Sequence, residues 1–347
     1  AYGYFTNPKV DPKNLGEGGT SDFVIEKVLK NHEFIKGQPA VTVPILMLDN
    51  KDKKYIIFCD VFKDNINPYR ADEALPGNVL LDYFTSLMKL NDEPVTKRLR
   101  FCFDYLNSTD QAVSMDAYRE FQKADDTDIR IVAKQLPAQA IVGWLSDPNT
   151  PTYRLGLYAL LLGHCGNPKT HGDLLYSLID NPKKREIAGI EGIMAGYVML
   201  QPQEGWIFLQ KILQSDKADE FNERYGALNT LRFFWDNRHD ALSKQQILQG
   251  VTLALAVPDI ADFAMDDLRI WKQWDMTDKV LDLFKKPSHD SPIIDRAILR
   301  FALCSKTPRA VEFVAAQRKR DPVWVSDTEE VLRADEAILN LAPANKK

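Results

Sequence analysis

Similar amphipathic segments recur along most of this chain at a nearly constant spacing, and this repetition restricts the fold more than any other feature. Six such segments begin at residues 115, 153, 185, 223, 261 and 295, which are 38, 32, 38, 38 and 34 residues apart. This is close to the length of a two-helix repeat of the HEAT or tetratricopeptide kind. One helix pair cannot bury its apolar face alone, so the pairs must stack on one another.

Helical periodicity is clear within the segments. Ile294, Ala297, Ile298 and Phe301 lie at positions i, i+3, i+4 and i+7 of one helix. The stretch at 153–166 (YRLGLYALLLGHCG) is apolar on almost every side, which predicts an inner helix that is covered on most sides. The Trp, Leu, Gly and Tyr signature of tetratricopeptide repeats is absent, so a HEAT-like α-solenoid over residues 76–342 is favoured.

Several predicted helices begin with a small polar residue followed by proline. The polar side chain can cap a free backbone N–H group, and proline suits the first helical position. Four dipeptides have this form: Thr150-Pro151, Asn181-Pro182, Ser291-Pro292 and Thr307-Pro308.

The chain before the repeats has a different composition and a different pattern of apolar residues. Residues 1–20 are rich in glycine and proline, which predicts an N-terminal arm, either ordered or loose. Residues 21–75 read as a small β-rich module with strands near 23–29, 40–48 and 54–62, because Val, Ile, Phe and Tyr dominate these runs. Pro44 lacks a backbone donor, so the second strand should be an edge strand or bulged.

Composition excludes some classes of function. The 347 residues carry a net charge of -5 and no long basic run, so nucleic acid is an unexpected partner. No apolar run is long enough for a membrane-spanning helix. The first residue is Ala1, which is compatible with export followed by removal of a signal peptide.

The cysteines and histidines do not predict a cofactor. The cysteines stand singly among apolar residues and are expected to be small buried side chains: Cys59, Cys102, Cys165 and Cys304. Zinc and haem signatures such as HExxH and CxxC are missing. His164, Cys165 and His171 are the closest approach to a ligand cluster, and packing around a turn is favoured over a metal there. No cofactor or metal is therefore expected.

Other letter patterns resemble catalytic motifs only superficially. Adjacent residues such as Ser288-His289-Asp290 cannot converge like a hydrolase triad, so a loop is expected. The GEGGT stretch at 16–20 lacks the remaining residues of a phosphate-binding loop. Clustered polar candidates for an enzyme reside in the N-terminal module: Asp60, Asp64 and Arg70.

Charged residues within the repeats read as structural. Asp266 lies three residues before Arg269, a spacing that favours an ion pair on one helix, whereas Asp267 is expected to be a solvated charge. Three arginines recur near the starts of repeat helices and could pair with an aspartate of the neighbouring repeat: Arg154, Arg224 and Arg296. Such a structural ladder is favoured over an anion-binding site.

Two aromatic clusters are the candidate protein-interaction residues. They comprise Phe233, Phe234, Trp235, Trp271 and Trp274. Three consecutive aromatic residues cannot all face one core stripe, so at least one should be partly exposed or lie under a neighbouring repeat. Packing between repeats is the favoured interpretation, and a binding hot spot is the alternative.

Five stretches of the sequence resemble a known family: residues 58–70, 153–166, 223–238, 268–275 and 285–304. Across roughly residues 22–333 the chain resembles a family of exported helical-repeat proteins from planctomycete bacteria. The resemblance implies an exported location such as the anammoxosome lumen. It also implies an assembly role beside the catalytic subunits of nitrite oxidoreductase in anammox bacteria, in a tubular polymer.

These observations lead to three hypotheses. The first is a non-catalytic scaffold or assembly subunit that binds other proteins through self-association or a hetero-polymer. The second is an enzyme or redox protein with an unrecognised site, in the N-terminal module or along the concave face of the array. The third is a peptide- or envelope-binding adaptor that forms a finite complex. Filament formation separates the first from the third, and a bound metal or chromophore would favour the second.

Overall fold

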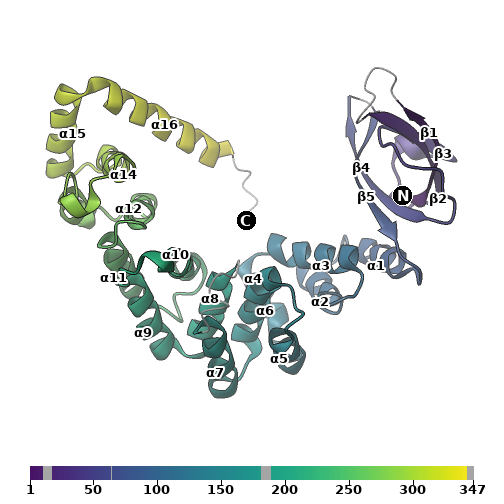
Figure 1. Cartoon of the computed structure of the whole chain (residues 1–347), viewed down its shortest axis with the longest axis horizontal. Helices are drawn as coiled ribbons and strands as arrows, with labels where there is room; N and C mark the ends of the chain where they lie inside the picture. Colours follow the sequence, from purple (N-terminus) through teal and green to yellow (C-terminus); the bar gives the residue numbers. More distant parts are fainter. Residues whose placement is uncertain (11–17, 64, 181–188, 342–347) are drawn as a thin grey trace. The chain divides into compact units, whose positions relative to one another are not determined.

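The computed structural model describes residues 1–10, 18–63, 65–180 and 189–341 and divides into two compact units. The first unit spans Ala1–Leu136 and the second spans Pro137–Lys347. The chain is mainly α-helical with an antiparallel sheet at its N-terminus, so the predicted fold class is confirmed (Figure 1). No helix in the described ranges combines the length and the apolar character needed to cross a membrane.

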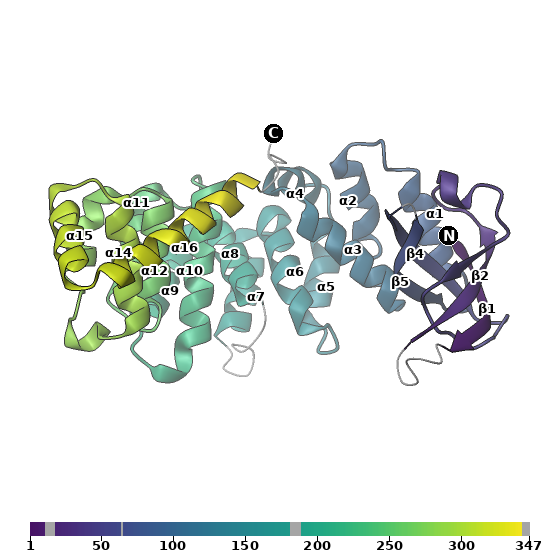
Figure 2. The ribbon, with the colours of Figure 1, turned by 90° about the horizontal axis from the view of Figure 1, so that it is seen from above.

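The sheet of the first unit has five strands in the order β3-β2-β1-β4-β5, and hydrogen-bonded neighbours are antiparallel. The strands are β1 (Tyr2–Val10), β2 (Gly19–Lys27), β3 (Ala40–Val43), β4 (Lys54–Phe62) and β5 (Asn65–Ala74). The outer strands β3 and β5 also contact each other, so the sheet curls toward closure (Figure 2).

Two strands differ from the sequence-based prediction. Residues 2–10 were expected to belong to an arm, yet they form β1 in the middle of the sheet, where Phe5 packs edge-to-face on Phe23 and Tyr55 at centroid distances of 5.0 and 5.1 Å. Residues 16 and 17, the first two of the GEGGT stretch, lie outside the described residues. The fifth strand, β5, was not predicted, although it lies within the region 21–75 that was predicted to be rich in β-structure.

The other strands agree better with expectation. β4 has the predicted bounds, and β2 begins four residues earlier than predicted. β3 ends at Val43, immediately before Pro44, and it is an edge strand in the hydrogen-bonded order. The missing donor of Pro44 therefore costs no ladder hydrogen bond.

Short helices complete the first unit. They are η1 (Glu33–Ile35), α1 (Val79–Met88), α2 (Val95–Phe103), α3 (Gln111–Lys123) and α4 (Asp126–Ala133). Phe84 of α1 packs edge-to-face on Phe58 of β4 at 5.1 Å, which joins the helix to the sheet. The predicted boundary near residue 75 marks the change from strands to helices, whereas the compact units divide at Leu136.

The second unit is a succession of helices with short connections. Its α-helices are α5 (Ala138–Ser146), α6 (Thr152–Cys165), α7 (Pro168–Ile179), α8 (Ile190–Leu200), α9 (Pro202–Leu213), α10 (Phe221–Asn237), α11 (Lys244–Leu255), α12 (Ala261–Ile270), α13 (Thr277–Leu281), α14 (Pro292–Cys304), α15 (Pro308–Arg320) and α16 (Pro322–Leu341). Three single-turn elements lie between them in the residues that the structure describes: η3 (Ala218–Glu220), η4 (Trp274–Met276) and η5 (Pro287–His289).

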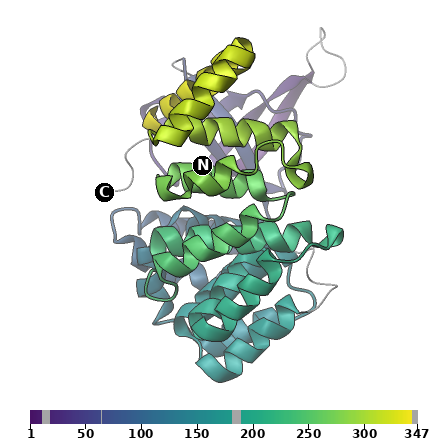
Figure 3. The same cartoon turned by 90° about the vertical axis from the view of Figure 1, so that its left-hand side faces the viewer.

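Every second helix contributes to a continuous stack. α6 contacts α8, α8 contacts α10, α12 contacts α14, and α14 contacts α16. The rings of Tyr225 and Phe263, 5.0 Å apart, join α10 to α12. Helices α9, α11 and α15 each contact the helix before and the helix after them, and Figure 3 shows the helices piled in chain order from teal to yellow.

The inner position predicted for residues 153–166 is confirmed by α6, which buries residues on several sides, including Leu155, Tyr158 and Leu162. Glycines allow its backbone to approach α8 very closely. A Cβ atom on Gly196 would lie 2.3 Å from the Ala159 carbonyl oxygen, and one on Gly192 would lie 2.5 Å from the Gly156 carbonyl oxygen. Only hydrogen fits at these positions.

The proline-marked helix starts are confirmed in position at Ser291-Pro292 and Thr307-Pro308, where proline is the first residue of α14 and α15. Neither Ser291 nor Thr307 makes the predicted side-chain capping hydrogen bond. Thr150 donates instead to the Trp144 carbonyl oxygen at 2.7 Å, and α6 begins one residue after Pro151. The Asn181-Pro182 dipeptide lies outside the described residues.

Candidate interaction sites

Three arginine–aspartate pairs of the second unit join residues that are 35 positions apart in the sequence. Arg224 pairs with Asp259, Arg232 pairs with Asp267, and Arg300 pairs with Asp335. Arg224 is almost completely buried and also donates to the carbonyl oxygens of Ser215 and Lys217 at 3.1 and 2.7 Å. The predicted pairing with a neighbouring repeat is therefore confirmed at Arg224.

The other two arginines of the predicted ladder lie in different environments. Arg154 is buried, and its Nε atom donates to the Tyr153 hydroxyl at 3.2 Å. Arg296 is exposed on α14. Arg232 and Arg300 were not predicted for this role, although an arginine and an aspartate 35 residues apart were visible in the sequence in both cases.

Asp267 is a correction to the sequence-based prediction. It was expected to be solvated, but it is only 4% exposed and accepts two hydrogen bonds from Arg232 Nε, at 2.7 and 3.0 Å. Burial raises the pKa of this carboxyl group to about 6, against the opposing attraction of the Arg232 guanidinium. Its neighbour Asp266 makes the predicted ion pair with Arg269, at 3.1 Å.

The predicted aromatic residues lie largely between helices. Phe234 is fully buried, whereas Phe233, Trp235, Trp271 and Trp274 are half-buried. Trp235 at the end of α10 stacks on Trp271 at the end of α12, with ring centroids 4.2 Å apart and planes inclined by 15°. This pair is a contact between successive stacked helices, and part of each ring remains accessible.

Trp274 lines an open groove of about 730 Å³ between the ends of α12 and α14 and the middle of α16. We call this the C-terminal groove, and its apolar residues are Ile270, Trp274, Leu303 and Leu332. Ile270 is 56% exposed and so contributes apolar surface to the groove. Apolar surface of this kind, with a polar edge, is typical of protein-interaction sites.

The edge of the C-terminal groove is basic, although the whole chain is acidic. Arg269, Lys272 and Arg333 line it together with the carboxylate of Glu329. Arg269 is paired with Asp266, and Arg333 Nε donates to the Glu329 carbonyl oxygen at 3.3 Å. Lys272 is exposed. Sequence reasoning found Trp274 but missed the α16 residues, because their proximity depends on how the last helices pack.

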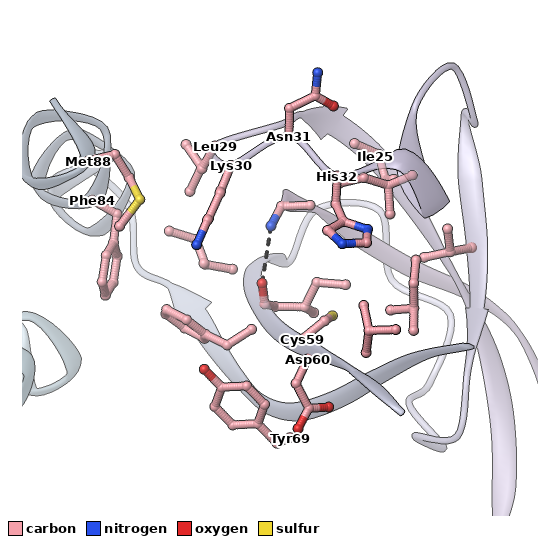
Figure 4. A pocket seen from close by; sticks show the side chains of 18 residues that line it. Ile25, Leu29, Lys30, Asn31, His32, Cys59, Asp60, Tyr69, Phe84 and Met88 are labelled. Atoms are coloured by element: carbon pink, nitrogen blue, oxygen red, sulfur yellow. Dashed lines mark hydrogen bonds between the residues drawn. The ribbon is translucent and has the colours of Figure 1, made fainter. Parts of the chain in front are cut away.

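A second candidate is the N-terminal pocket, a cavity of about 500 Å³ in the first unit (Figure 4). β2, β4, β5, α1 and the connection from β2 to β3 form its walls, and its lining is chiefly aliphatic and aromatic. The β4–β5 ladder slips by one residue between Phe58 and Cys59, and residues on both sides of this bulge line the pocket. Bulges commonly re-aim side chains beside functional sites.

Polar groups stand among these apolar walls. Lys30, Asn31 and His32 come from the β2–β3 connection, while Cys59 and Asp60 come from β4 (Figure 4). Cys59 is exposed, which contradicts the prediction that it is a buried apolar side chain. Surrounding protein atoms nevertheless raise its pKa, so the thiol stays protonated and is a poor nucleophile.

Two of the three polar residues considered for an enzyme site have different surroundings. Asp60 lines the N-terminal pocket and accepts a hydrogen bond from Asn67 at 2.9 Å. Arg70 instead pairs with Asp72 and with Asp116, the latter at 3.5 Å. Asp64 lies outside the described residues.

The remaining cysteines form no disulfide with one another or with Cys59, and all four lie in the described part of the chain. Cys102 is buried, as predicted, whereas Cys165 and Cys304 are partly exposed. His164, Cys165 and His171 contact different partners: the Arg238 guanidinium, the Leu161 carbonyl oxygen and the Asn167 amide. Within residues 1–10, 18–63, 65–180 and 189–341, no group of three potential ligand side chains could hold a metal ion.

The Ser288-His289-Asp290 stretch has a structural geometry. Ser288 Oγ lies 2.8 Å from His289 Nδ1, while His289 Nε2 lies 3.0 Å from the Leu255 carbonyl oxygen. His289 is buried, and its ring joins η5 to the end of α11. Asp290 pairs with Lys285, away from the histidine ring, so no triad is assembled.

Fold and sites together define a helical-repeat protein with an N-terminal β-sheet unit and two candidate binding surfaces. Comparison with models of protein families, with curated proteins and with solved structures yields no match.

Proposed function

We propose that the chain is a non-catalytic scaffold or assembly subunit whose helical unit binds other proteins. The observation that carries this proposal is the C-terminal groove, where the exposed Ile270 and the partly exposed Trp274 lie beside the basic Lys272. Tryptophan and arginine are enriched among the residues that dominate binding energy at protein interfaces. The matching partner presents apolar side chains flanked by carboxylates.

The sequence resemblance extends the proposal to a particular assembly. The chain resembles the tubule-inducing subunit of nitrite oxidoreductase from anammox bacteria, within the planctomycete family described above. By this resemblance the partners are the catalytic subunits of that enzyme, held in a tubular polymer in the anammoxosome lumen. A stack of helix pairs supports such a role because it presents a series of contact surfaces along its length.

Negative-stain electron microscopy of the purified chain, alone and mixed with native extract, tests the proposal. Filaments or enzyme-decorated tubules in a preparation without metal or visible absorbance are the expected outcome. Isolated particles that carry stoichiometric metal or chromophore would contradict it and favour an enzyme. Complexes of fixed size without polymer would favour a finite adaptor.

Variants of the C-terminal groove connect this test to the structure. Ile270→Glu places a negative charge among the basic residues and should reduce partner recovery at least about tenfold, as expected for losing a contact of 1.4 kcal/mol or more. Ile207→Glu is the matched control, because Ile207 is 65% exposed on α9 and does not line the groove. Equal loss in both variants, or loss in neither, would remove the groove from the proposal.

A further inference from the structure

The N-terminal pocket has the size and lining of a small-molecule site, and no role in the proposed scaffold function accounts for it. Its volume of about 500 Å³ lies within the range typical of ligand pockets, and mouths of β-barrels are common places for them. Ile25, Ile57, Phe58, Phe84 and Met88 form an apolar interior.

Water reaches this apolar interior from one side. Val61 and Tyr69 line the pocket and are 43% and 66% exposed, so the apolar lining continues to the molecular surface. Filling such a space with an apolar group removes apolar surface from water, which is favourable in proportion to the area covered. The lining therefore selects a ligand with an apolar body.

The polar groups at the pocket determine which polar head group the ligand carries. Lys30 extends into the pocket in Figure 4, and it has no ion-pair partner among the residues that the structure describes. Asp60, a carboxylate of the lining, accepts a hydrogen bond from Asn67. Within the described residues, the Lys30 amine is thus an unpaired cation beside the apolar lining, and it favours an anionic group on the ligand.

We propose that the N-terminal pocket binds a single-chain amphiphile with an anionic head, such as a medium-chain carboxylate. The chain lies against Ile57, Phe58 and Met88, and the carboxylate lies at the Lys30 amine. Binding is reversible and noncovalent, because neither the alkyl chain nor the carboxylate of such a ligand is an electrophile. This inference is independent of the scaffold function.

Isothermal titration calorimetry of the full chain at pH 7 with decanoate, decanol and decylamine, each below its micellar concentration, tests the proposal. Saturable binding with one ligand per chain is expected, strongest for decanoate and weakest for decylamine. Lys30→Ala should weaken decanoate binding about fivefold or more and leave decanol unchanged. Lys36→Ala is the matched control, because Lys36 is exposed on the same β2–β3 connection and does not line the pocket.

A second variant separates the pocket from the rest of the surface. Val61→Trp fills the pocket from a partly exposed position, and circular dichroism confirms that the variant is folded. It should abolish binding of both decanoate and decanol. Undiminished binding to folded Val61→Trp, no saturable binding to the native chain, or binding only to vesicles containing anionic phospholipid would each overturn the proposal.

Discussion

At the scale of single residues, the burial of the Asp267 carboxyl group predicts how the stability of the chain depends on pH. Its carboxyl group has a pKa of about 6, raised from 3.8 by burial, so the folded chain holds the proton more tightly than the unfolded chain does. The stabilisation from protonated Asp267 is complete below about pH 4 and is lost as the pH rises through 6. A difference of about two pKa units corresponds to about 3 kcal/mol.

The contribution of Asp267 to stability can be isolated by comparing the native chain with the Asp267→Asn variant. The free energy of unfolding of the native chain, minus that of Asp267→Asn, should decrease by up to about 3 kcal/mol between pH 4 and pH 7. Urea unfolding across this range measures it, and the subtraction removes contributions from other carboxylates. A difference that is flat or increases with pH would show that the Arg232 ion pair outweighs desolvation.

The ion pairs of Arg224 and Arg309 should contribute very different amounts to stability. Arg224 is buried with three hydrogen-bonding partners, so Arg224→Ala should destabilise the chain by about 3–5 kcal/mol. Arg309 pairs with Asp278 and Asp282 in solvent, so Arg309→Ala should have little effect on stability. Thermal unfolding of both variants measures the contrast, and equal costs would contradict it.

At the scale of elements, the packing of α6 on α8 predicts the effect of a single methyl group. Gly196→Ala places a Cβ atom against the Ala159 carbonyl oxygen and should destabilise the chain by about 1–3 kcal/mol, despite the better helix propensity of alanine. Gly143→Ala on α5 meets open space and should stabilise it by about 0.5–1 kcal/mol. Denaturant unfolding of the pair checks both signs.

The elements also show what the sequence could and could not predict. Helical periodicity located the stacked helices, because each helix buries a stripe of residues close together in sequence. Strand β1 was missed because its Gly- and Pro-containing sequence gains its order from pairing with β2 and β4. Asp267 was misjudged for a similar reason, since its partner is 35 residues away on the preceding stacked helix.

At the scale of the whole molecule, the two compact units predict independent folding. A fragment of residues 137–347 should be helical by circular dichroism and unfold cooperatively, because it contains its own core. Its far-ultraviolet signal per residue should exceed that of the full chain, since the sheet is absent. An unfolded fragment would show that residues 1–136 are needed for its stability.

The 35-residue offset shared by three arginine–aspartate pairs also indicates how the array of helices could become longer during evolution. Each of the helices α10 and α14 supplies an arginine to the helix that follows it in the stack, and α12 and α16 supply the receiving aspartates. A tandem duplication of a segment that contained both the arginine and the aspartate would copy the ion pair together with the helices that it connects. The ladder thus provides a chemical route by which gene duplication lengthens the array without inventing a new interface.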